Sequence, residues 1–342
     1  MKILLKEIAK QAGVSEATVS RVINKTVPVS PAMEQRVFDA VQTLGADLSA
    51  NKIKRNRTGD KPLVIGLIVS DLSNPFFEVV MRGVVSEAQF YDYGVQIFET
   101  NEDLATENRI FELIPRFQLG GLIICASGVS DSKLIAFFTR TKIPLVVLNR
   151  LINYPQINCI TIDHHKAMYQ AAMHLINLGH KRIAYLSGPS KREPSISRGN
   201  GIREALKQSG LELSSELCVS SFPNEEGGFH AMISLLALPK AKRPTGVIAF
   251  NDLIALGAMR AIRTKNLRIP EDISVVGNDN IEMAIHCYPA LTTISPPKNY
   301  LGKLAVQTIN SVLQNHGEET PNGFIQIEAP LTLRYSTGVA PN

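Results

Sequence analysis

Residues 5–24 read LKEIAKQAGVSEATVSRVIN, and this stretch decides the fold of the N-terminal part of the chain. Apolar residues at helical spacing predict a first helix over about residues 5–12, a break at Gly13, and a second helix over about 16–24. Ser15 is a suitable N-cap for the second helix. Two short helices joined by a tight turn can place the second in the major groove of DNA, although plain helical hairpins share the pattern.

The same spacing predicts which side chains pack inside this head. A third helix is expected over about residues 32–44, after Ser30 and Pro31, and a basic, polar linker over 46–61. The side chains expected to face inward are Ile8, Ala9, Ala12, Val19, Val22, Ile23, Val37, Ala40, Val41 and Leu44.

Positive charge is concentrated at the N-terminus. The first 60 residues hold ten Lys and Arg against six Asp and Glu, whereas the whole chain has a formal net charge of only +5. A basic head on a nearly neutral body indicates a polyanionic partner, or simply a solvated basic surface. The sequence shows no membrane-length apolar run, no secretory signal and no metal-binding cysteine spacing, so we expect a cytoplasmic protein.

From residue 63 onward, strand-like apolar runs alternate with helical stretches. This alternation predicts βαβ units and parallel sheets. The strands are too many for one compact sheet, so we expect two similar α/β halves with a cleft between them, split near residues 160–162. The expected strands cover residues 63–69, 95–99, 121–125, 145–148, 183–186, 247–250 and 273–277.

Polar residues follow several of these strands, at the edge where doubly wound sheets bind their ligands. A single polar residue at a strand end is more often a turn or a helix cap. The residues at these positions are Ser70, Asp71, Ser127, Asn149, Arg150, Asn251, Asp252 and Asp279.

Residues 9–24 closely resemble the DNA-binding head of the lac/galactose repressor (LacI/GalR) family. The resemblance continues in family order along nearly the whole chain, which makes it more specific than any one motif. The matching segments are IGLIV (65–69), SNPFF (73–77), GGLII (120–124), GHKRIA (179–184), NDLIALGA (251–258), IPEDISVVG (269–277) and PALTTI (289–294).

The resemblance implies an all-α helix-turn-helix head plus an α/β core of two doubly wound parallel-sheet subdomains, as in periplasmic binding proteins. We expect residues 1–46 to form the DNA-binding domain, 47–61 the hinge or linker, and 62–342 the effector-binding and dimerisation core. Subdomain N would comprise residues 62–160 and 292–320, and subdomain C residues 161–291 and 321–342, with crossings near 160–162, 291–296 and 320–325.

The function implied is that of a sequence-specific DNA-binding transcriptional regulator, expected to be a repressor, under allosteric control by a small polar effector. The expected partners are near-palindromic double-stranded operator DNA, a second copy of the chain in a homodimer, and the effector, with no cofactor, metal or membrane. The bacterial protein would associate with the nucleoid when bound to DNA. The expected DNA contacts are Ser15, Glu16, Ala17, Thr18, Ser20, Arg21, Asn24, Lys52, Lys54 and Arg55.

The hinge departs from the family pattern, which includes a leucine that inserts into the minor groove. Ungapped alignment places Arg55 at the leucine position and Lys52 at an alanine position, so no apolar wedge for kinking stands there unless a gap shifts Ile53 into its place. Lys52, Lys54 and Arg55 would instead contact phosphates or enter the minor groove, unless the segment is a disordered basic linker.

Within the core, the resemblance assigns effector contacts residue by residue. Arg198 matches the arginine of an Arg-x-x-Gly motif, Asp279 an acidic ligand residue, and Asn251 a polar contact. Asn278 replaces an aromatic residue, which favours a sugar or sugar acid over a flat purine; an inducer and a corepressor both fit. The expected set is Asp71, Phe76, Phe77, Ser127, Asn149, Arg198, Phe222, Asn251 and Asp279, although each phenylalanine also suits a plain core.

Two other protein classes have the same core pattern. One is a solute-binding protein without DNA activity, which the basic head and the lack of a signal peptide disfavour. The other is a sugar-processing enzyme, which the lack of P-loop, GxSxG and HExxH motifs disfavours. The adjacent His164 and His165 point apart on a helix, so we interpret them as surface or interface residues rather than metal ligands.

Overall fold

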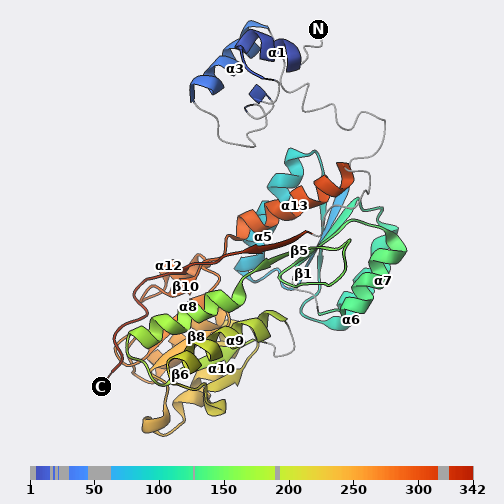
Figure 1. The fold of residues 1–342 in the computed structure, drawn as a ribbon. Helices are drawn as coiled ribbons and strands as arrows, with labels where there is room; N and C mark the ends of the chain where they lie inside the picture. The colour runs from blue at the N-terminus through green and yellow to red at the C-terminus, as the bar shows by residue number, and fades with distance from the viewer. Residues whose placement is uncertain are drawn as a thin grey trace. The chain divides into compact units, whose positions relative to one another are not determined.

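The computed structural model describes residues 5–15, 18–19, 22, 31–44, 63–125, 128–188, 193–314 and 323–341. The chain divides into two compact units, Met1–Pro62 and Leu63–Asn342, and each is described by itself. Figure 1 shows the elements of both, coloured along the chain.

The first unit contains a small helical cluster. Helix α1 (Leu5–Ala12) contacts α3 (Pro31–Thr43), and helical residues Val19 and Val22 complete the core between them. The predicted inward-facing positions are confirmed where the structure describes them, since Ile8, Ala9, Ala12, Val19, Val22, Val37, Ala40 and Val41 are all buried, and Leu44 is partly buried against the same core.

The turn after α1 has the geometry that its sequence requires. Gly13 has a φ of +65°, a left-handed conformation that a residue with a side chain rarely adopts. Ser15 then caps the next helical segment, because the Thr18 backbone N–H donates to Ser15 Oγ at 3.1 Å. The predicted break at Gly13 and the Ser15 cap are therefore confirmed.

The first half of the second unit is built on a parallel sheet. Within the described ranges this sheet has six strands in the order β11-β5-β4-β3-β1-β2, and all of its pairings are parallel. The strands are β1 (Val64–Val69), β2 (Gly94–Glu99), β3 (Gly121–Cys125), β4 (Leu145–Leu148), β5 (Asn158–Ile162) and β11 (Phe324–Ile327).

Helices cover both faces of this sheet. Helices α5 (Pro75–Phe90) and α13 (Lys298–Gln314) pack on one face, and α6 (Leu104–Leu113) with α7 (Asp131–Thr141) on the other (Figure 1). Because both faces are covered, β3 and β4 are buried along their whole length and read as continuous apolar runs. A short 3-10 helix, η2 (Ile114–Arg116), follows α6.

The second half repeats this plan. In the part of the chain that the structure describes, its six strands run in the order β12-β10-β9-β8-β6-β7, parallel except for the β10–β12 pair. The strands are β6 (Ile183–Ser187), β7 (Cys218–Ser220), β8 (Gly246–Ala249), β9 (Ser274–Asn278), β10 (Thr292–Ile294) and β12 (Leu331–Thr332).

Two helix pairs enclose the second sheet. Helices α8 (His164–Asn177) and α9 (Glu193–Gln208) pack on one face, and α10 (Glu225–Leu236) with α11 (Asp252–Thr264) on the other. Shorter elements complete this half: α12 (Met283–His286), η3 (Ser215–Leu217) and η4 (Lys240–Lys242).

The expected strands all form, with bounds within one residue of the predicted ones. Strands β7, β10 and β12 were not predicted, because runs of two or three residues carry too little periodicity to register. β5 was predicted only as a crossing point near residues 160–162.

The chain crosses between the halves three times in the described segments, and the last crossing differs from the prediction. The last lies between Ile327 and Leu331 rather than near 320–325, because β11 pairs with β5 in the first sheet. The second crossing overlaps the predicted residues 291–296, but β10 pairs with β9, so residues 292–294 belong to the second half rather than to the predicted segment 292–320 of the first. Half-exposed edge strands such as β11 give a weak sequence signal.

Candidate functional site

A cleft of about 570 Å³ lies within the second unit, at the carboxyl ends of strands from both sheets. Parallel sheets present ligand-binding loops at this edge, and the volume falls within the range usual for small-molecule sites. Its apolar walls include Phe76, Phe77, Leu104, Leu151, Ile196 and Phe250, and its polar residues include Glu107, Asn149, Arg150, His164, Arg198 and Asp279.

Arg198 is the central cation of the cleft and is only 6% exposed. Its Nη1 donates to the Phe250 carbonyl at 2.6 Å, and its guanidinium lies 4.1 Å from the centroid of the Phe250 ring. Its Nε donates to His164 Nδ1 at 3.4 Å. The guanidinium is thus held by α8 and by the end of β8 as well as by its own helix α9.

The position of Arg198 depends on how closely α9 approaches α8. Gly201 faces the backbone of His165 in α8, where a Cβ atom would come within 2.1 Å of the carbonyl oxygen. The glycine of the Arg-x-x-Gly motif therefore has a steric reason: it lets α9 lie against α8, so that Arg198 reaches His164.

Asp279 is the acidic counterpart of Arg198 and follows β9. It is 5% exposed, and Asn278 Nδ2 donates to its Oδ1 at 2.6 Å. Burial raises the pKa of the Asp279 carboxyl, while the nearby Arg198 guanidinium lowers it. Lys298 Nζ donates to the backbone carbonyls of Asp279 and Asn280, which fixes the loop to the first turn of α13.

Asn251 lines the cleft, but its side chain also has a structural role. Its Oδ1 accepts from the Ile254 backbone N–H at 2.9 Å and so caps α11, while its Nδ2 donates to the Pro223 carbonyl at 3.0 Å. The next residue, Asp252, is fully buried and accepts from Ile281 N–H and Thr293 Oγ1. Burial raises the pKa of Asp252 to about 6.

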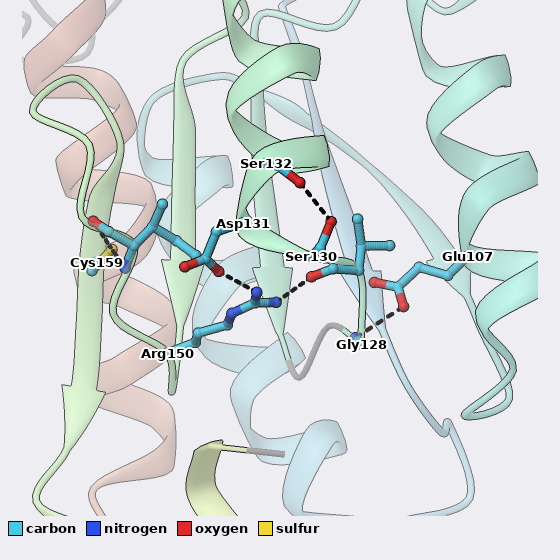
Figure 2. A network of polar contacts seen from close by, with 9 residues as sticks. Glu107, Gly128, Ser130, Asp131, Ser132, Arg150 and Cys159 are labelled. Atoms are coloured by element: carbon cyan, nitrogen blue, oxygen red, sulfur yellow. Dashed lines mark hydrogen bonds and ion pairs between the residues drawn. The ribbon is translucent and has the colours of Figure 1, made fainter. Parts of the chain in front are cut away.

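The wall contributed by the first half carries a polar network (Figure 2). Arg150, which follows β4, donates to the Val129 carbonyl and to the Asp131 carboxylate, and Glu107 Oε2 accepts from Gly128 N–H at 3.0 Å. Both interactions hold the start of α7 and the segment before it against β4 and α6. Glu107, Gly128, Asp131 and Arg150 all line the cleft.

Two buried polar atoms in the cleft lining have no hydrogen-bond partner among the described residues. They are Asn149 Oδ1 and His164 Nε2, in side chains 7% and 3% exposed. An unsatisfied buried polar group costs about 1–3 kcal/mol. Such groups in a concave site mark where a ligand would supply the missing partners.

The structure brings together six of the expected effector contacts. Phe76, Phe77, Asn149, Arg198, Asn251 and Asp279 all line the one cleft. Two others are not in its lining: Asp71 accepts from Ser73 N–H and Oγ in a local turn, and Phe222 is 59% exposed. Ser127 lies outside the described residues.

Sequence reasoning missed several lining residues. The interpretation of His164 as a surface or interface residue is wrong, because it is buried in the cleft, whereas the His165 side chain is partly exposed and pairs with Glu204. Helix α8 begins at His164, so its first turn lies where the chain crosses between the halves rather than facing solvent. The predicted crossing near residues 160–162 could have indicated that His164 is buried. Phe250 and Glu107 gave no distinguishing pattern.

Little of the expected DNA-binding surface can be placed. Ser15 and Thr18 are described and form the cap; Glu16, Ala17, Ser20, Arg21, Asn24, Lys52, Lys54 and Arg55 lie outside the described residues. Among the residues that are described, no three His, Cys, Asp or Glu side chains gather as metal ligands, and no helix is long and apolar enough to cross a membrane.

Two parts of the chain match protein families. Residues 4–45 match the bacterial regulatory proteins of the lacI family, and residues 62–333 match the periplasmic binding proteins and sugar binding domain of the LacI family. The chain belongs to the LacI family. These matches confirm the predicted family and fold class. This LacI-family chain is a DNA-binding transcriptional repressor and not an enzyme.

Curated relatives of this LacI-family chain carry the name HTH-type transcriptional repressor PurR. The protein from Aliivibrio fischeri (strain MJ11) is 32% identical, over 92% of this chain and 93% of the relative. The protein from Pasteurella multocida (strain Pm70) is 34% identical, over 97% and 98%.

Solved structures of LacI-family proteins share the fold. A complex of the transcriptional regulator CelR with cellobiose is 26% identical with a TM-score of 0.73, covering 98% of this chain and 100% of that one. The lac repressor dimer bound to operator and the anti-inducer ONPF is 27% identical with a TM-score of 0.73, covering 99% and 100%. A regulator from Enterococcus faecium with bound ribose is 26% identical with a TM-score of 0.72, covering 81% and 99%.

Proposed function

We propose that this chain represses transcription under the control of a small polar effector bound in the cleft, and that the effector is a sugar or a sugar acid. The observation that carries the proposal is the composition of the cleft. A buried guanidinium and a buried carboxyl lie beside two unsatisfied polar atoms and between apolar walls. Sites of this kind orient a polar ligand through a few directed groups.

A sugar suits this lining better than a flat base. Its hydroxyls both donate and accept, which matches the donors of Arg198 and the acceptors of Asn149 and Asp279. Asn278, at the position of the family's aromatic residue, is buried and donates to Asp279, so it offers no stacking face. Relatives solved with cellobiose and with ribose support the same class.

The charges in the cleft favour a neutral sugar over a sugar acid. Three carboxyl groups, of Glu102, Glu107 and Asp131, line the cleft against the two guanidinium groups of Arg150 and Arg198. Burial raises the pKa of Asp279 to about 8, so this fourth carboxyl adds little charge at neutral pH. Excess negative charge in a partly desolvated site opposes an anionic ligand. A nucleobase remains the competing class, because curated relatives are named PurR and three phenylalanines line the cleft.

The partners on the DNA side are double-stranded near-palindromic operator DNA and a second copy of the chain. The similar lac repressor, solved as a dimer on its operator, supports both. Exposed apolar side chains of the second unit, Met283, Ile285 and Tyr288 near α12, suit burial against a second copy. Two-fold symmetry of the protein then matches the symmetry of the operator.

In this arrangement residues 1–46 bind DNA, residues 47–61 form the hinge, and the core from residue 62 binds the effector and dimerises. Glu16, Ala17 and Arg21 select the operator, and Lys52, Lys54 and Arg55 contact phosphates. Effector binding shifts the population between a DNA-competent and an incompetent dimer. The protein acts in the cytoplasm, on the nucleoid.

A combined binding screen tests the proposal. Operator sites are first selected from random DNA with the full chain and verified by gel shift. Thermal unfolding is then followed with neutral sugars, sugar acids, sugar phosphates and nucleobases, because a specific ligand raises the melting temperature by mass action. Stabilisation by a neutral sugar that also changes operator affinity supports the proposal; stabilisation only by nucleobases contradicts the sugar assignment.

A further inference from the structure

His164 occupies a position that the proposed effector site does not yet explain. It is the first residue of α8, directly after the chain leaves the first sheet. Asp163 caps this helix by accepting from the Lys166 backbone N–H at 2.9 Å. The His164 ring is 3% exposed and lines the cleft beside Arg198.

The contact with Arg198 fixes the tautomer of His164. The Arg198 Nε–H can only donate, so His164 Nδ1, 3.4 Å away, must present its lone pair. The proton of the neutral ring therefore sits on Nε2. Burial and the adjacent guanidinium hold the pKa of His164 well below its ordinary value, which keeps the ring neutral.

The Nε2–H is thus a buried donor, and it has no hydrogen-bond partner among the described residues. On the other half, Asn149 Oδ1 is a buried acceptor that also lacks a hydrogen-bond partner among the described residues. Asn149 directly follows β4, whereas His164 begins α8, so the two atoms come from different halves of the cleft. A ligand that satisfies both contacts both halves.

We propose that His164 determines effector specificity by donating its Nε2–H to an uncharged acceptor of the effector, such as a hydroxyl, ring or carbonyl oxygen. The inference rests on the proposed effector function and deepens it. The complementary acceptor at Asn149 requires a hydrogen-bond donor elsewhere on the same effector. Ligands that offer only donors or only apolar surface near His164 leave Nε2–H unsatisfied and bind weakly.

Two substitutions separate donation from packing. His164→Leu removes both ring nitrogens at similar bulk, and His164→Gln keeps an amide N–H that can reach the position of Nε2. His165→Leu is the matched control, since the His165 side chain is partly exposed and contacts Glu204 rather than the cleft. Arg198→Ala reports independently on whether the cleft is the effector site.

Affinity is measured by calorimetry on the full chain, with whichever sugar, sugar acid or nucleobase stabilises the wild type most. His164→Leu should weaken binding by about tenfold or more. His164→Gln should recover most of that loss, and His165→Leu should bind as the wild type does. The ¹⁵N resonance of Nε2, assigned by its disappearance in His164→Gln, should show a protonated nitrogen that shifts when the probe binds.

The outcomes distinguish this inference from the proposed function. If Arg198→Ala loses binding while His164→Leu keeps it, the cleft is the effector site and the role of His164 is wrong. If His164→Gln is as weak as His164→Leu, His164 acts through its shape or through its contact with Arg198, and donation to the effector is excluded. If no probe stabilises the wild type, the proposed effector class fails and the inference fails with it. If His164→Leu does not fold, the inference is tested by the change in the wild-type Nε2 ¹⁵N resonance when the probe binds and by the probe affinity of His164→Gln. An Nε2 resonance that does not shift when the probe binds would contradict the inference.

Discussion

Gly201 in α9 lies so close to His165 in α8 that a Cβ atom on the glycine would come within 2.1 Å of the histidine carbonyl oxygen. A separation this short cannot be accommodated by a side-chain rotation, because the opposing atom belongs to the backbone of a helix. The spacing of α8 and α9, and with it the contact between Arg198 and His164, depends on residue 201 having no side chain.

Substitution of Gly201 should therefore disturb both stability and effector binding. Gly201→Ala is expected to lower the free energy of unfolding by about 1–3 kcal/mol, as for other overpacked interiors, and to reduce effector affinity by displacing Arg198. Urea unfolding and calorimetry measure the two effects. Asn200→Ala, at the exposed preceding position, is the control; equal stability of the two variants would show that the helices separate without cost.

Acid should destabilise the protein through His164. The unfolded chain takes up a proton on this residue near its ordinary pKa of 6.5, whereas the buried ring in the folded state does not, so stability is lost as pH falls below 6.5. At pH 5.5, one unit below that ordinary value, the loss from one such histidine is on the order of 1 kcal/mol. Between pH 7.5 and 5.5, His164→Leu should thus gain about this much relative to the wild type.

Denaturant unfolding at the two pH values measures the difference. His165→Leu removes the neighbouring, partly exposed imidazole and serves as the control. A variant His164→Leu that loses stability in acid as steeply as the wild type would mean that His164 is protonated in the folded protein.

The sequence predicted the architecture well because its signals are local and repeated. Buried parallel strands such as Val64–Val69 and Gly121–Cys125 are apolar along their whole length, and these bounds were predicted within one residue. The partners of short or edge strands were not predictable. Phe324–Ile327 alternates between exposed and half-buried residues, and only its register with β5 places it in the first half.

The residues that line the cleft were predicted where they lie in a local sequence pattern and were missed where only tertiary packing places them. Arg198 and Asp279 lie in motifs shared with a family, and Asn149 follows a strand that the sequence showed clearly. His164, Glu107 and Phe250 line the cleft through the packing of α8, α6 and β8, and that tertiary relationship leaves no pattern in the chain. The burial of His164 in particular depends on where the first crossing ends.

Lys298 should couple the effector loop to the first half. Its Nζ donates to the carbonyls of Asp279 and Asn280, 2.8 Å from the latter, while its own helix α13 packs on α5. Lys298→Met should leave one buried and one partly buried carbonyl without this donor and cost about 1–3 kcal/mol of stability, together with weaker effector binding. Urea unfolding and calorimetry test this against Lys303→Met on the same helix. Comparable losses at both positions would assign the effect to α13 itself.

The Ser15 cap should stabilise the head. Ser15→Ala removes the acceptor for Thr18 N–H and is expected to cost about 1 kcal/mol, whereas Ser15→Asp keeps an acceptor. Hydrogen exchange of residues 5–22 in the full chain would detect faster opening in Ser15→Ala only. Ser15→Asp should still weaken DNA binding, because it adds negative charge at a position expected to contact DNA, which is a polyanion. Normal protection in Ser15→Ala would show that the hydroxyl contributes nothing to the helix.

The basic hinge can be tested through the salt dependence of DNA affinity, which reports the number of phosphate contacts. Lys52, Lys54 and Arg55 stand where the family has residues that include an apolar wedge, and we expect them to contact phosphates. Each phosphate contact releases counterions and adds about 0.9 to the slope of log K against log salt concentration. Replacing all three with alanine should therefore flatten the slope by about 2 to 3. Filter binding to a selected operator over a range of salt concentrations measures this, with Lys2→Ala as a basic control outside the hinge. An unchanged slope in the triple variant would make residues 47–61 a passive linker, and the charge of the head alone would then have to account for the electrostatic part of DNA affinity.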